Sequence, residues 1–257
     1  MHAYATAEAT ATRRAAPRLL RAGPGWRIAA LLAIAAVPIW ALGRFTDIDL
    51  VLADALYDGV ARTFPWRDAW LTDLFAHRIL KNVLSLLAAL VVAAAIGDAI
   101  RPLGLLAQPL ARLRLRVIAG SAFAVPFVIS LLKQGNNAHC PWDLARYGGS
   151  QPYVHLFDAL PPGVLPGHCL PAGHASGALW LIALAVLWLP HHPRKALRAA
   201  CAALAFGLAV GSMQQLRGAH FLTHTLWSTW IACGIVLGLV LVGQSLSGRA
   251  RLHGAMG

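Results

Sequence analysis

The feature of this sequence that most constrains its fold is a series of six apolar segments that carry no charged side chain. These segments are residues 28–43, 82–97, 117–132, 175–190, 199–216 and 225–248. A helix needs about 20 residues to cross a bilayer, and flanking long side chains such as Arg can extend a segment that is somewhat shorter. Ala and Gly are abundant in these segments, which suits close packing of helices in lipid. We therefore expect an all-α, polytopic membrane protein, built as a bundle of six transmembrane helices.

The positive charge of the chain is also a feature of proteins that bind nucleic acid. Its net charge is +12, although charged residues make up only 12% of the sequence, against about 25% in soluble domains. The basic residues occur in short blocks between the apolar segments, so we expect a lipid bilayer as partner and no nucleic acid.

The basic residues are also distributed unequally between the two sides of such a bundle. With six crossings, fourteen Lys and Arg residues fall on the side of the termini and eight on the other, which holds eight of the ten acids. An excess of Lys and Arg marks the cytoplasmic side, so both termini should be cytoplasmic. The expected organisation is an N-terminal tail (1–26), a membrane domain (27–248) and a C-terminal tail (249–257).

The first outer loop, residues 44–81, contains six Asp residues among Leu, Phe and Trp. Mixed polarity at helical spacing predicts one or two amphipathic helices that lie on the outer membrane surface. Such helices could form a lid or a surface through which a lipid enters, and a simple connector is an equally good interpretation.

The second outer loop, residues 133–174, is rich in Gly, Pro and polar residues, and long loops of this kind are often functional. Cys140 and Cys169 both fall in it, in a compartment that permits disulfides. We expect a Cys140–Cys169 bond that brings the two ends of the loop together. Cys201 and Cys233 lie in apolar segments, as small core residues do. The cysteine spacing does not resemble a zinc site.

The third outer stretch, residues 213–224, reads MQQLRGAHFLTH. His220 and His224 are four apart and share a helix face, which Arg217 joins. Three cationic or proton-carrying side chains at a membrane boundary suggest an anion site, with phosphate the obvious candidate. The alternative is a basic helix end that binds lipid headgroups.

Three clusters in this order, Lys133 to Pro141, PAGH at 171–174 and GAH at 218–220, resemble the motifs of the type-2 phosphatidic acid phosphatase superfamily. Members of that superfamily are membrane lipid phosphatases whose motifs read K-x6-R-P, P-S-G-H and S-R-x5-H-x3-D on a six-helix bundle. The resemblance covers roughly residues 75–245 and points to a divergent bacterial branch. Residues that match the motifs are Lys133, Pro141, Pro171, Gly173, His174 and His220. Residues that depart from them are Cys140 for Arg, Ala172 for Ser, Gln214 for Arg and His224 for Asp.

The resemblance implies a metal-independent mechanism without a cofactor. His220 would attack phosphorus as a neutral imidazole and form a phosphohistidine. His174 would protonate the leaving oxygen and then activate water. His224, at the position of the family Asp, would orient the His220 ring.

The same resemblance implies a set of phosphate-binding groups. Lys133 and Arg217 would hold the phosphoryl oxygens, and Arg217 would replace the guanidinium missing at Gln214. Backbone N–H groups of Ala172 and Gly173 could add a helix N-terminal anion site. Further candidates to line the site are Gln214 and two residues near Cys140, namely Asp143 and Arg146.

The expected function is removal of phosphate from a lipid phosphate or diphosphate on the periplasmic side of the bacterial inner membrane. Lipid A, undecaprenyl diphosphate and phosphatidylglycerol phosphate are possible substrates. Two alternatives stay open: a phosphotransferase that uses the same site with a lipid hydroxyl as acceptor, and a non-catalytic member that binds or transports a phospholipid.

Overall fold

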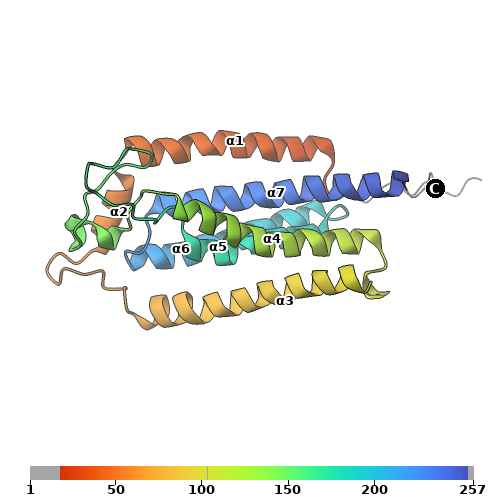
Figure 1. Ribbon diagram of the computed structural model, residues 1–257, viewed down its shortest axis with the longest axis horizontal. Coiled ribbons are helices and arrows are strands. Elements are labelled where there is room, and N and C mark those ends of the chain that lie inside the picture. The colour runs from red at the N-terminus through yellow and green to blue at the C-terminus, as the bar shows by residue number, and fades with distance from the viewer. Residues whose placement is uncertain (1–17, 103, 254–257) are drawn as a thin grey trace, which may run out of the picture.

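A computed structural model describes residues 18–102 and 104–253 and shows an all-α protein, as predicted (Figure 1). Within these ranges there are no strands, only isolated bridges between Asp58 and Thr63 and between Leu144 and Gln151. The helical elements are α1 (Ala22–Phe45), α2 (Ile48–Leu56), η1 (Trp70–Leu80), α3 (Lys81–Ile100), η2 (Gly104–Leu106), α4 (Pro109–Gln134), η3 (Pro141–Asp143), η4 (Ala145–Tyr147), α5 (Gly173–Leu179), η5 (Trp180–Trp188), α6 (Pro193–Leu216) and α7 (Leu222–His253).

Five helices in the described ranges are long and apolar enough to cross a membrane, which agrees with a multi-pass membrane protein. They are α1, η1 continued by α3, α4, α6 and α7. The fourth predicted segment forms the shorter helix Gly173–Trp188. Its last nine residues are a 3₁₀-helix, which rises further per residue than an α-helix, so the segment reaches about 28 Å. That length approaches the hydrocarbon core of a bilayer, and the sixth crossing remains a prediction.

The start of α1 and the end of α7 lie at the same end of the bundle, as the predicted topology requires (Figure 1). Helix α1 begins at Ala22, inside the expected N-terminal tail, and residues 1–17 of that tail lie outside the described residues. Helix α7 continues to His253. The described part of the expected C-terminal tail, residues 249–253, is therefore helical.

The segment α5–η5 lies in the centre of the bundle, where α4, α6 and α7 pack around it. Helix α6 approaches its neighbours closely at two glycines, one facing α5 and one facing α7. A Cβ at Gly207 would collide with the Leu179 side chain, and one at Gly211 would collide with Thr225 of α7. These small residues let α6 end beside α5 and α7, where the second and third motifs lie.

The first outer loop is more than a connector, because it supports the start of α7. Helix α2 lies in this loop, and its buried Asp49 accepts hydrogen bonds from the Thr223 backbone N–H (3.0 Å) and hydroxyl. Helix N-termini leave their first N–H groups unpaired, so Asp49 caps α7 from another helix. The remainder of the loop runs into the second long helix through η1, a π-helical segment, and forms no second surface helix.

Candidate functional site

The two ends of the second outer loop are joined, as predicted, by a Cys140–Cys169 disulfide with a Cα–Cα distance of 5.3 Å. Backbone hydrogen bonds strengthen this junction, since the N–H groups of His168 and Cys169 donate to the carbonyls of Asn136 and Ala138. The junction holds the C-terminal end of α4, which carries Lys133, close to the start of α5. The other two cysteines are free, and Cys201 is exposed rather than part of the core.

The second motif places His174 as the second residue of α5. Ahead of it, Ala172 links the second motif to the third. The N–H of Ala172, expected to bind phosphate, donates instead to the His224 carbonyl (3.3 Å), and its own carbonyl accepts from Ser228 Oγ (3.1 Å). Gly173, the other expected backbone donor, begins the helix beside His174.

The third motif turns sharply between α6 and α7, and Gly218 makes the turn possible. Its φ of 71° is in the left-handed region that favours glycine, and a Cβ there would collide with the Phe64 ring. The Gly218 carbonyl accepts a hydrogen bond from Trp142 N–H, next to the first motif. Backbone contacts therefore bring all three motifs together.

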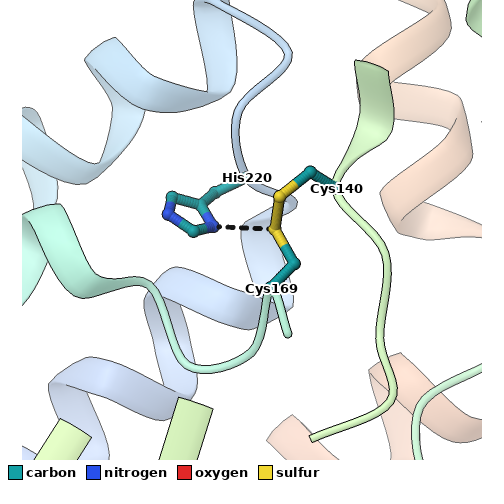
Figure 2. Close-up of side chains that lie close together, drawn as sticks. All are labelled: Cys140, Cys169 and His220. Carbon is teal, nitrogen blue, oxygen red and sulfur yellow. Dashed lines mark hydrogen bonds between the residues drawn. A yellow bond between two sulfur atoms is a disulfide. The ribbon is translucent and has the colours of Figure 1, made fainter. Parts of the chain in front are cut away.

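His220, which follows this turn, has one ring nitrogen directed at the disulfide. Its Nδ1 lies 3.4 Å from Cys169 Sγ, as Figure 2 shows. The side chain is only 3% exposed. With Nδ1 on the disulfide side, Nε2 is the nitrogen left for chemistry.

The structure gathers three predicted histidines around one point. The rings of His174 and His220 have centroids 6.1 Å apart, and those of His220 and His224 are 5.8 Å apart. Both ring nitrogens of His174 and of His224 are buried, and none has a hydrogen-bond partner among the residues that the structure describes. The predicted orientation of His220 by His224 therefore does not take the form of a hydrogen bond between them. Unpaired buried nitrogens are rare in proteins and are typical of functional sites.

Burial lowers the pKa of His220 well below its usual value of 6.5. The neighbouring His224 and His174 and the positive charge of Lys133 lower this pKa further, while a backbone hydrogen bond with Cys169 opposes them. A positive environment disfavours a second positive charge. His220 is therefore neutral at physiological pH, which is the form that a nucleophile requires.

Arg217 is buried and already bonded to the protein. It donates to Asp73 Oδ1 (2.7 Å), the Arg67 carbonyl (2.9 Å) and Gln214 Oε1 (3.1 Å). Burial lowers its pKa, which Asp73 opposes, but an Arg side chain stays charged in proteins. Its link to Gln214 puts a guanidinium one helical turn from the position where the motif has Arg. Nε2 of Gln214 is buried and unpaired.

Asp143 and Arg146, predicted as possible lining residues, make structural contacts in the second loop. Asp143 accepts a hydrogen bond from the Cys140 N–H (3.1 Å). Arg146 is exposed and forms a two-pronged ion pair with Asp54 of α2, at 2.7 and 2.6 Å. Both residues therefore stabilise the second loop. Asp143 bonds within it, and Arg146 joins it to α2.

Cys140, Cys169 and His220 have ligand atoms within 4.8 Å of one another, a spacing that could hold a metal ion. Metal binding by cysteine requires thiolates. The two sulfurs are bonded to each other here, so this cluster is better described as a disulfide packed against a histidine.

Three residues of one helical face near the site were not predicted from the sequence. Asp73, His77 and Lys81 follow each other at intervals of four, on η1 and the start of α3. Asp73 holds Arg217, the His77 ring lies 4.3 Å from that of His174, and the charge of Lys81 acts on His174. The i, i+4, i+8 spacing of an acid, an imidazole and an amine was the available signal.

Comparison with known proteins agrees with this geometry. The family model of the PAP2 superfamily matches residues 114–246, which include Lys133, His174 and His220. The chain belongs to the PAP2 superfamily. Searches among curated proteins and among solved structures found no match. PAP2 membership implies phosphatase-type activity on phosphate esters, and the apolar helices make this PAP2 protein a multi-pass membrane protein.

The low pKa of His220 predicts how stability depends on pH. Below about pH 6.5 the unfolded chain binds a proton at His220 that the folded PAP2 protein does not bind, so stability should fall as the pH falls. The loss from this residue should reach about 1.4 kcal/mol per pH unit. Denaturant unfolding in detergent between pH 7 and 5 should show a shallower pH slope for His220→Gln. Equal slopes would show that His220 titrates normally in the fold.

Proposed function

We propose that this protein is a membrane phosphatase that removes phosphate from a lipid phosphate or diphosphate through a phosphohistidine on His220. The observation that carries the proposal is the pair of imidazoles of half-buried His174 and buried His220, whose ring centroids are 6.1 Å apart. That separation leaves room for a phosphorus atom between a nucleophile and a proton donor.

In the first step His220 Nε2 attacks phosphorus, a new N–P bond forms and the ester P–O bond breaks. His174 gives its proton to the leaving lipid oxygen. In the second step neutral His174 takes a proton from water while the water oxygen attacks the phosphohistidine. Inorganic phosphate leaves, His220 is neutral again and His174 has recovered its proton, so one water is consumed per ester.

Cationic side chains stabilise the charge that the phosphoryl oxygens gain in the transition state. The positive charge of Lys133, at the end of α4, acts electrostatically on both His174 and His220. The charge of Arg217 also acts electrostatically on His174. Arg217 has five N–H donors, of which three hydrogen-bond to the protein and two remain available. Held by Asp73 and Gln214, Arg217 contributes a fixed positive charge, and this agrees with its expected role as a phosphate ligand.

A lipid substrate and a periplasmic site are supported by the position of the motifs. They lie at the end of the bundle opposite the termini, on the side with fewer basic residues (Figure 1). By the charge rule this side faces away from the cytoplasm. A lipid phosphate in the outer leaflet of the inner membrane would present its headgroup at this level.

The test is phosphate release by the purified protein in detergent, over a panel of lipid A, undecaprenyl diphosphate and phosphatidylglycerol phosphate. We expect free phosphate from at least one lipid, with no effect of added chelator, because each step uses protein side chains and water. Transfer to a lipid hydroxyl without free phosphate would identify a phosphotransferase. Binding of all three lipids without turnover would identify a non-catalytic member and contradict the proposal.

A further inference from the structure

The N-terminal half of the chain adds a fourth imidazole to the site, that of His77, which lies outside the range that the family model matches. His77 lies on η1, and its ring centroid is 4.3 Å from that of His174, with the two planes tilted by 42°. These two rings are closer together than those of His174 and His220 (6.1 Å) or of His220 and His224 (5.8 Å).

The ring of His77 lies across the boundary between the site and the exterior. The residue is half-buried, but its Nδ1 atom is fully buried and has no hydrogen-bond partner within residues 18–102 and 104–253. The two ring nitrogens of the adjacent His174 are likewise buried and lack a partner among the described residues. Three unpaired nitrogens on two neighbouring rings are not explained by packing, because a buried polar atom ordinarily finds a partner.

The helix that carries His77 is tied directly to the third motif. Asp73, one turn earlier, forms an ion pair with Arg217 at 2.7 Å, and Arg217 is bonded to Gln214. Lys81, one turn later, adds a positive charge that acts on both His77 and His174. His77 therefore lies on the helix between Asp73, which pairs with the guanidinium of Arg217, and the positively charged Lys81.

We propose that His77 contacts the substrate, and that its buried Nδ1–H donates a hydrogen bond to a phosphoryl oxygen held between His174 and His220. This inference rests on the proposed function. Phosphoryl oxygens only accept hydrogen bonds, so Nδ1 must carry the proton in the bound state, as a neutral imidazole can. A hydrogen bond to a charged oxygen is stronger than one between neutral groups.

The experiment measures the dissociation constant of inorganic phosphate for the full-length protein in detergent, by calorimetry. His77→Gln removes the donor at the Nδ1 position and should weaken phosphate binding about tenfold or more. His77→Asn keeps an amide N–H close to that position and should bind more tightly than His77→Gln. His191→Gln changes an exposed histidine between η5 and α6, outside the site, and should bind phosphate as the wild type does.

Other outcomes separate this inference from the proposed function. If His77→Gln binds phosphate as tightly as the wild type, His77 does not touch the phosphoryl group, even if KM for a lipid phosphate rises. If Asn and Gln are equally weak, the effect is loss of ring packing and the donor role is wrong. Wild-type protein that neither binds nor releases phosphate would overturn the proposed function and this inference with it.

A measurement on the wild-type protein covers the case in which a His77 variant does not fold. Diethyl pyrocarbonate modifies accessible imidazoles, and mass mapping gives the rate at each histidine. Phosphate should slow modification of His77 severalfold and leave exposed His191 unchanged. Equal rates at His77 with and without saturating phosphate would overturn the inference.

Discussion

His220→Gln should eliminate both turnover and the covalent phosphoenzyme. The side chain is 3% exposed and directs Nδ1 to the disulfide, so no other imidazole can take over its Nε2 position. Loss of a nucleophile commonly costs several orders of magnitude, and we expect a fall on the order of 10⁴-fold or more in kcat. The measurement is an acid-labile ³²P label on the protein after rapid quenching, together with steady-state phosphate release.

The matched control is His191→Gln, which makes the same substitution at an exposed position away from the site. It should label and turn over like the wild type. Full activity of His220→Gln combined with loss of activity on chelation would contradict the mechanism and move the chemistry to a metal site.

His174→Gln should produce the second largest effect, and the size of that effect should depend on the leaving group. An alkoxide leaves poorly unless it is protonated, so lipid phosphates should be hydrolysed about 10² to 10⁴ times more slowly. An activated aryl phosphate leaves without a proton, and its first step should be much less affected. The measurement is the rate of phosphoenzyme formation for the two substrates in a single turnover.

A structural defect would slow both substrates equally, so the ratio of the two rates distinguishes the acid from a packing residue. The ring nitrogens of His174 have no hydrogen-bond partner in the described part of the chain, so replacement of His174 by Gln should leave the melting temperature close to that of the wild type. Equal slowing of the two substrates would contradict the acid role.

The helical bundle and the central residues of the site could be predicted from the sequence because each rests on a local pattern. Runs of apolar residues determine membrane helices, and the structure has a helix over each of the six runs. The disulfide could be predicted because its two cysteines share one loop. The pairing of His174 and His220 was implied by the resemblance of two short segments to the second and third motifs of the superfamily.

The contacts of the site with the first outer loop could not be predicted, because they join residues far apart in the chain. Arg217 bonds to Asp73, 144 positions earlier, and nothing in the stretch MQQLRGAHFLTH indicates that partner. His224 was given the role of the family Asp, but its ring has no bond to His220. The sequence position of a side chain specifies its helix face and leaves its tertiary partners open.

The bonds from the first outer loop to the third motif also define the smallest fragment that can be expected to retain the site. Asp49 caps α7, Phe64 lies against Gly218 and Asp73 balances Arg217. All three precede residue 114, where the family match begins. A recombinant protein cut at that boundary would carry the three motifs intact and still lose the cap, the packing and the counter-ion. The autonomous folding unit of this protein is therefore longer than its recognisable homology.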